Sequence, residues 1–287
     1  MSNKVKNIPA SNRVKLLNYS HITGESFQQV VQLFAMNRFL YRLSQSQYAP
    51  SLILKGAMLI YAQSTVISRS TLDIDFLGQF DNSELSIYNA VKTIIGCPVE
   101  DDGLVFLTET IQTSAITKDA GYVGGRVNFQ VKLDAMVIPM QIDIGFGDII
   151  TPAALQIDTP TLLGYPSGKI YGYTFETSIA EKIHVMMKLD LLNSRMKDFY
   201  DIWFLMQTNQ IDKEILIQAI ICTFEARKTK IDMESVIFTD KFLSNKAKQI
   251  QWTAFCRKKK IKDAPVLFFE IAKQILEYLY PILEKAS

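Results

Sequence analysis

Within the stretch from Ser70 to Leu77, polar and apolar residues alternate from Thr71 to Phe76, and this alternation constrains the fold more than any other feature of the chain. Side chains of a β-strand point alternately to its two faces. Asp73 and Asp75 therefore project from one face of a predicted strand, while the apolar residues around them enter a core. Two carboxylates held side by side repel unless a cation lies between them. The pair predicts a site for a hard divalent cation with substrate phosphates, and hence phosphoryl or nucleotidyl transfer.

The charge of the chain is small overall but unevenly distributed. The 287 residues are 48% hydrophobic and 21% charged, as in a folded protein of one large or two modest domains. The net charge is +2, but residues 224–262 hold eleven Lys/Arg and four Asp/Glu, so this segment carries +7 and the rest −5. A basic segment beside an acidic remainder indicates a polyanionic partner. A lysine-rich helical face exposed to solvent is the alternative explanation.

Cysteine usage and hydropathy indicate a cytoplasmic protein. The three cysteines are far apart and show neither zinc-ligand spacing nor a disulfide framework, which fits a reducing compartment. The N-terminal residues lack the apolar core of a signal peptide. The sequence has no apolar run of the roughly 20 residues that a membrane span needs. We therefore expect no membrane partner.

Strand patterns are concentrated before residue 150 and helical patterns after it. This order predicts an α+β fold, with a small mixed sheet and flanking helices in residues 1–150 and a mainly helical domain in residues 151–287. Prolines and glycine between residues 151 and 168 predict a loop-rich connector. The predicted strands are 51–54, 72–77, 104–116, 126–135 and 139–144, and the predicted helices are 26–43, 57–63, 83–95, 174–191, 196–206 and most of 211–287.

Lys55-Gly56-Ala57 joins a predicted buried strand to a predicted helix. Glycine at the start of a helix lets backbone N–H groups approach a phosphate without a side chain in the way. Arg69 and the carboxylate pair follow in the order expected of a phosphate site with a metal beside it. An edge strand with two solvated aspartates is the alternative.

Asp143 lies between two isoleucines on the predicted strand 139–144. A buried carboxylate is costly unless it is paired or bound to a metal. If this strand neighbours the strand of Asp73 and Asp75, Asp143 completes a two-metal site and helps to deprotonate an attacking hydroxyl. An aspartate that caps the strand end is the alternative, and Asp148 fits that role better.

Lys182 lies on a largely apolar predicted helix and needs a partner. A nucleotide phosphate is one such partner. Asp198 and Asp201 lie one helical turn apart on the next helix, and either could pair with Lys182 or Arg195 in a purely structural ion network. The residues alone leave both interpretations open.

In their order, these motifs resemble the AbiEii/AbiGii-type nucleotidyltransferases, which are toxin components of abortive-infection and toxin–antitoxin systems. The resemblance covers roughly Ser26 to Leu205, and one departure is Gly56-Ala57, where many relatives have Gly-Gly or Gly-Ser. The matching segments are 39–44, 54–59, 69–77, 99–106, 124–127, 141–148, 160–163, 176–182 and 193–201.

The resemblance implies a DNA-polymerase-β-like nucleotidyltransferase core with an appended helical domain. It implies a nucleoside triphosphate (NTP) substrate, magnesium or manganese as cofactor, a cognate antitoxin and, as in some relatives, a tRNA 3′ end as acceptor. It also implies roles for individual residues. Asp73 and Asp75 become metal ligands with Asp143 in the third-carboxylate position, Lys182 and Arg69 become phosphate contacts, and Asp198 becomes a further active-site carboxylate.

We therefore predict a metal-dependent nucleotidyltransferase toxin that transfers a nucleoside monophosphate to an RNA or tRNA 3′ end. Lys55, Gly56, Ala57, Arg69 and Lys182 are the predicted nucleotide-binding residues, and either Asp143 or Asp198 is the predicted base. The basic C-terminal helices would hold the RNA through its phosphates. The alternatives are a non-catalytic nucleotide- or RNA-binding protein of the same fold, and a transferase acting on a protein or small-molecule hydroxyl.

Overall fold

The computed structural model describes residues 7–64, 69–117, 123–208 and 211–287. The chain forms two compact units, which are interleaved in sequence. The first unit consists of Met1–Thr65, Ser70–Gly147 and Gln156–Gly172, and the second consists of Val66–Arg69, Asp148–Leu155 and Tyr173–Ser287. The division at residue 150 into separate domains stays a prediction.

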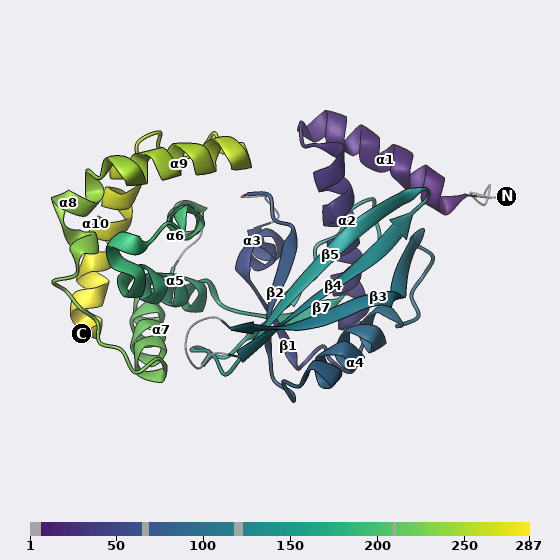
Figure 1. The fold of residues 1–287 in the computed structure, drawn as a ribbon, viewed down its shortest axis with the longest axis horizontal. Helices are drawn as coiled ribbons and strands as arrows, with labels where there is room; N and C mark the ends of the chain where they lie inside the picture. Colours follow the sequence, from purple (N-terminus) through teal and green to yellow (C-terminus); the bar gives the residue numbers. More distant parts are fainter. Residues whose placement is uncertain (1–6, 65–68, 118–122, 209–210) are drawn as a thin grey trace. The chain divides into compact units, whose positions relative to one another are not determined.

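Seven strands form one mixed sheet in the order β3-β4-β5-β2-β1-β7-β6 (Figure 1). β2 runs parallel to β5 and antiparallel to β1, and β4 pairs antiparallel with both β3 and β5. This sheet with its flanking helices confirms the predicted α+β class. The strands are β1 (Leu52–Lys55), β2 (Asp73–Gly78), β3 (Leu104–Thr117), β4 (Val123–Leu133), β5 (Met136–Phe146), β6 (Leu155–Asp158) and β7 (Lys169–Gly172).

Helices α2 (Phe27–Ser44) and α4 (Glu84–Ile95) pack on one face of this sheet. The Phe39 ring of α2 lies 6.4 Å from that of Phe76 on β2 and 6.1 Å from that of Phe129 on β4. Gly125 on β4 makes room for α4, because a Cβ at this position would lie 2.4 Å from Ile87 Cδ1. Ile74 and Phe76 are fully buried, as predicted. The core position predicted for Leu72 is wrong, because Leu72 precedes the first residue of β2 and is 61% exposed.

The other helices of the first unit are α1 (Ile8–Thr23) and α3 (Gly56–Ser64). The sequence predicted α3 but gave no signal for α1, because α1 buries only Asn12, Leu16 and Ser20 and so lacks a continuous apolar stripe. α3 begins at the residue after β1. The chain therefore turns directly from strand to helix at Gly56.

The predicted loop-rich connector is wrong in part, because β6 and β7 lie within or just after it. β7 pairs in parallel with β1, with Ile53 opposite Tyr171 and Leu54 opposite Gly172. Each of these strands has only four residues, too few to show an alternating pattern. They are stabilised by pairing with strands that are distant in sequence, which a local pattern does not contain.

The second unit is built from helices, as the sequence predicted. The rings of Phe199, Phe242 and Phe268 pack together in its core, with centroids between 5.1 and 6.2 Å apart. In the described residues, no helix combines the length and apolar character of a membrane span. The helices are α5 (Phe175–Leu189), α6 (Met196–Thr208), α7 (Lys213–Ala226), α8 (Asp240–Leu243), α9 (Lys246–Lys259) and α10 (Phe268–Ala286), with short 3₁₀ turns η1 (Asp190–Leu192) and η2 (Val236–Phe238).

A buried ion cluster ties α2 to the segment before β3. Asp102 accepts hydrogen bonds from Arg42 Nη1 at 2.6 Å and Nη2 at 3.1 Å and from Arg38 Nε at 2.8 Å. The Asp102 side chain is 1% exposed and that of Arg38 2%. Burial disfavours the Asp102 charge, but the two guanidinium groups outweigh it and lower the pKa of Asp102. The cluster is stable only as a complete set.

We expect Asp102→Asn to destabilise the protein by about 3–5 kcal/mol, because it leaves buried Arg42 without its anion and Arg38 with only the exposed Glu100. Urea unfolding followed by circular dichroism measures this loss. Asp101→Asn is the matched control, because Asp101 is exposed and is expected to change stability by less than about 0.5 kcal/mol. Equal effects of the two substitutions would contradict a structural role for the cluster.

Candidate active site

Four charged residues lie in one cross-strand row on the face of the sheet opposite α2 and α4. The backbone register pairs each residue with the next, across four neighbouring strands. Paired residues in adjacent strands place their side chains on the same face. The row is Lys55 on β1, Asp75 on β2, Asp143 on β5 and Arg126 on β4.

Asp73 belongs to the next row, where it pairs with Gln141 of β5. Asp73, Asp75 and Asp143 each offer one carboxylate oxygen such that the three oxygens lie within 4.8 Å of one another. Asp143 is buried, and the other two are half-buried. The structure therefore brings together the three carboxylates that the sequence predicted, and it does so through the parallel pairing of β2 with β5.

Hydrogen bonds fix two of these carboxylates. Arg126 donates to Asp143 from Nε to Oδ1 at 2.8 Å and from Nη2 to Oδ2 at 2.7 Å. Gln141 Nε2 donates to the same Oδ1 at 3.4 Å, and Thr71 Oγ1 donates to Asp73 Oδ1 at 2.5 Å. Bidentate pairing with a guanidinium restricts both position and rotation of a carboxylate. Arg126 therefore fixes the orientation of the Asp143 carboxylate before any ligand binds.

The negative charge of the three carboxylates raises the pKa of Arg126. The hydrogen bond to Asp143 is the main cause and burial opposes it, while the charges of Asp143, Asp73 and Asp75 add to the increase. Lys55 stands at the other end of the row, beside Asp75. Two cations therefore flank the carboxylates and reduce the repulsion between them.

Gly56 is required where it stands, for two separate reasons. Its φ is +71°, which L side chains rarely adopt, and a Cβ there would lie 2.3 Å from Asp75 Oδ2. The backbone at the start of α3 thus passes directly against a carboxylate oxygen. Ala57 follows in the first turn of α3 and is buried.

The three carboxylates suit a hard divalent cation. Such ions take oxygen ligands, and carboxylates select magnesium or manganese over softer metals. Oxygens bound to one magnesium ion at about 2.1 Å lie at most about 4.2 Å apart. The observed limit of 4.8 Å is close to this, so small side-chain rotations are enough to form a site.

In the second unit, Lys182 of α5 lies in a cluster of charges with α6. Lys182 Nζ donates to Asp201 Oδ2 at 2.9 Å and to Asp198 Oδ1 at 3.3 Å. Arg195 Nε donates to Asp198 Oδ2 at 2.5 Å, and Arg69 donates to both oxygens of Asp201 at 2.6 and 2.9 Å. The ion pairs that the sequence left open are therefore present. Asp201 is the partner that the sequence did not predict for Arg69.

Pairing outweighs burial for every member of this cluster whose pKa changes. Burial disfavours charge on Asp198, but Lys182 and Arg195 outweigh it and lower the pKa of Asp198. Burial also disfavours charge on Asp201, and there Arg69 and Lys182 lower the pKa. Burial likewise disfavours charge on Lys182, but Asp201 and Asp198 raise its pKa. All three side chains are therefore ionised near neutral pH. In these contacts, the three cations Lys182, Arg69 and Arg195 face the two carboxylates of Asp198 and Asp201.

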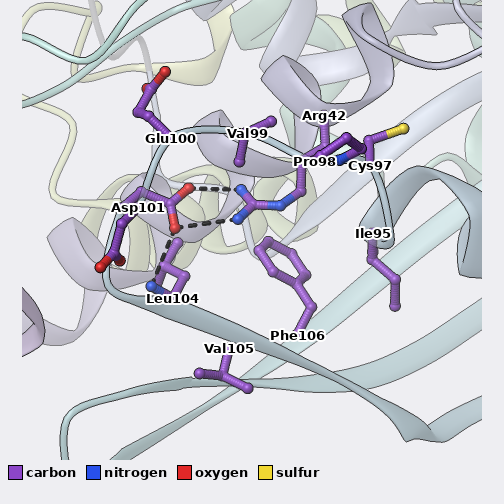
Figure 2. Close-up of a pocket in the computed structure, with 11 residues that line it drawn as sticks. Arg42, Ile95, Cys97, Pro98, Val99, Glu100, Asp101, Leu104, Val105 and Phe106 are labelled. Atoms are coloured by element: carbon purple, nitrogen blue, oxygen red, sulfur yellow. Dashed lines mark hydrogen bonds and ion pairs between the residues drawn. The ribbon is translucent and has the colours of Figure 1, made fainter.

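A pocket of about 360 Å³ lies elsewhere in the first unit, beside the Arg42–Asp102 ion pair (Figure 2). Figure 2 shows Arg42 and Phe106 pointing into it, with Cys97 at one side. The Arg42 guanidinium lies over the Phe106 ring at 4.4 Å from its centroid. None of the predicted site residues lines this pocket. We infer that the Arg42–Asp102 ion pair beside this pocket stabilises the fold.

Sequence reasoning missed Arg126 as a member of the site. Its signal was present in the β4–β5 hairpin, whose two-residue turn Asp134–Ala135 sets the register. Counting outward from that turn places Arg126 opposite Asp143. The predicted strand ended at residue 135, two residues beyond the end of β4, so the predicted elements did not contain the turn from which the register is counted.

Comparison with known proteins finds a matching family model and solved structures of similar fold. The family model described as "Nucleotidyl transferase AbiEii toxin, Type IV TA system" matches residues 38–271. The crystal structure of JHP933 from Helicobacter pylori is similar, with 14% identity, a TM-score of 0.53 and coverage of 89% of this chain and 93% of that one. That of a "putative nucleotidyltransferase" from H. pylori has 16% identity, a TM-score of 0.50 and coverage of 91% and 97%. Comparison with the curated proteins found no match.

We expect Gly56→Ala to weaken the binding of Mn²⁺ and to cost more stability than Gly164→Ala. Both glycines have positive φ, +71° and +75°, so both substitutions introduce similar backbone strain. Only at Gly56 does the new Cβ meet a carboxylate; at Gly164 no atom lies within 4 Å. Thermal unfolding and titration calorimetry with Mn²⁺ measure the two effects. Equal Mn²⁺ affinity in both variants would contradict close packing of Gly56 against the metal site.

We expect Arg195→Gln to lower stability by about 1 kcal/mol at pH 7, and this difference to shrink in acid. The pKa of Asp198 is lowered in the folded state, so its contribution is fully present above the unfolded pKa of about 3.9 and is lost as pH falls through the folded pKa. Urea unfolding at pH 7 and in steps below about pH 4 measures the difference. Lys197→Gln, at an exposed neighbouring position, controls for net charge. A difference independent of pH would contradict the assignment.

Proposed function

The chain belongs to the AbiEii nucleotidyl transferase toxin family, and on that premise we propose that it transfers a nucleoside monophosphate from an NTP to the 3′ end of an RNA in a reaction that needs a divalent cation. The observation that supports this most strongly is the convergence of Asp73, Asp75 and Asp143. tRNA is the acceptor that we predict. A cognate antitoxin is the protein partner that the family implies.

In the proposed reaction, an oxygen of the acceptor hydroxyl attacks the α-phosphorus of the NTP. A new O–P bond forms, the bond between the α-phosphorus and the bridging oxygen to the β-phosphate breaks, and pyrophosphate leaves. The hydroxyl proton passes to a carboxylate. A bound magnesium or manganese ion supplies charge neutralisation at the phosphates in such a reaction.

Asp73 and Asp75 would hold the cation, with Asp143 as the third ligand. Asp143 Oδ1 or Oδ2 is also our first candidate to accept the hydroxyl proton, because Arg126 already orients this carboxylate. Asp198 is the second candidate for this role. Arg195 and Lys182 hold both of its oxygens, just as Arg126 holds both oxygens of Asp143. The preference for Asp143 therefore rests on its place beside Asp73 and Asp75.

Positive side chains bind the NTP phosphates in this proposal. Lys55 stands beside Asp75, and Gly56 and Ala57 open α3 at the same place. Lys182, whose side chain is 14% exposed, is the further triphosphate contact that the family resemblance implies. Because Asp201 holds the Arg69 guanidinium, the phosphate contact predicted for Arg69 stays a prediction.

The exposed cations of the C-terminal segment favour a polyanionic acceptor. Arg257, Lys258, Lys260 and Lys262 at and after the end of α9 are all exposed. Such groups bind phosphodiesters without reading sequence. A cationic small molecule would be repelled by the same surface.

We expect the double substitution Asp73→Asn/Asp75→Asn to reduce the incorporation of radiolabelled nucleotide into total tRNA by at least about 10³-fold. It removes both charges that hold the cation and preserves side-chain volume. Asp158→Asn is the matched control, because Asp158 is an exposed strand residue paired with Lys169. Circular dichroism checks that the variants are folded.

Three results would overturn the proposal. Full incorporation by the double variant would exclude the carboxylate pair from catalysis. Metal-dependent nucleotide binding by the wild type, without label entering any RNA, would favour a non-catalytic binding protein. Label on a protein or small molecule instead would identify another acceptor.

A further inference from the structure

β4 presents a regular row of polar side chains on the same face of the sheet as the three carboxylates. Its alternate residues Val127, Phe129, Val131 and Leu133 are at most 2% exposed and form the core. The residues between them point the other way. They are Arg126, which is half-buried, and Asn128, Gln130 and Lys132, which are exposed. We call these four residues the β4 polar row.

The β4 polar row starts at the active-site carboxylates and leads away from them. Arg126 contacts Asp143, Asn128 pairs across the sheet with Gln141, and Lys132 pairs with Val137 near the far end of the hairpin. From Arg126 to Lys132 the strand rises about 20 Å. The row is therefore long enough to contact a short length of polymer whose end lies at Asp143.

The charge of the row is positive. It carries two cations and two amides. Asp143 pairs with Arg126 at the active-site end, and farther along the row the paired neighbours of Asn128, Gln112 on β3 and Gln141 on β5, are neutral. The acidic residues of the flanking segments lie outside the row. Asp134, in the turn after β4, pairs with Arg13 at 3.6 Å, and Glu109 lies in the irregular stretch of β3.

Arg126 has donors left over for a ligand. Asp143 uses its Nε–H and one Nη2–H, and in the part of the chain that the structure describes no contact is found for Nη1. The side chain is 39% exposed, whereas that of Asp143 is 7% exposed. A guanidinium of this kind can hold a carboxylate on one edge and a phosphate on another.

We propose that the β4 polar row binds the last nucleotides of a single-stranded RNA acceptor. This inference rests on the proposed function, because that function places the acceptor 3′ hydroxyl at Asp143. Arg126 and Lys132 contact backbone phosphates, and Asn128 and Gln130 donate hydrogen bonds to phosphates or bases. A row of cations and amides without carboxylates complements a phosphodiester chain.

The test measures the binding of a short fluorescein-labelled single-stranded RNA to the full-length protein by anisotropy, without NTP, over a series of salt concentrations. Lys132→Gln should weaken binding and reduce the slope of log K against log[salt] by about 0.7, the value for one lost phosphate contact on a single strand. Gln130→Lys should strengthen binding and increase the slope by a similar amount. Misfolding of the Gln130→Lys variant would not explain a gain in its affinity for RNA.

Lys92→Gln is the matched control, because Lys92 is an exposed lysine of α4, which covers the opposite face of the sheet. It should leave affinity and slope as in the wild type. If Lys132→Gln and Gln130→Lys also leave them unchanged, or if the wild type does not bind the RNA, the inference is wrong. A third outcome is that RNA binding depends on the row but the wild type incorporates no radiolabelled nucleotide into RNA. The row then binds RNA, and only the proposed transfer is wrong.

Discussion

Mutual repulsion among three carboxylates is the physical constraint on which the rest of the first unit depends. Asp73, Asp75 and Asp143 are brought within 4.8 Å by the backbone pairing of β2 with β5. Side chains free to move would separate, because like charges at this distance repel. The sheet prevents this, and the cations Lys55 and Arg126 at the ends of the row offset part of the repulsion. A metal ion would offset the remainder.

The three carboxylates of the first unit and the Lys182 cluster of the second unit differ in what remains for a ligand to do. In the second unit, Asp198 and Asp201 are each held by two cations, and the cluster is nearly complete by itself. In the first unit the carboxylates outnumber the cations that flank them. A buried ion pair contributes most when all its members are present. We therefore regard the first cluster as the cation site and the second as a source of positive charge.

Local pattern was enough to predict the alternating strand β2, the buried strand β1, and the helices with a strong apolar stripe. It also indicated Asp143, because a carboxylate between two isoleucines needs a partner. The partner of Arg126 was missed because the hairpin turn was misplaced, although the turn is local in sequence. The pattern could not supply the partner of Arg69, which lies 132 residues away in sequence, nor the short strands β6 and β7. These features depend on pairing between distant segments, which composition and periodicity do not encode.

The most direct test of the central claim is an anomalous difference map from crystals of the wild type grown with Mn²⁺ and a non-hydrolysable NTP. The account predicts a peak at about 2.2 Å from carboxylate oxygens of Asp73 and Asp75, with Asp143 turned toward it. A peak bound only by other residues, or an ordered nucleotide with no metal at these carboxylates, would contradict it.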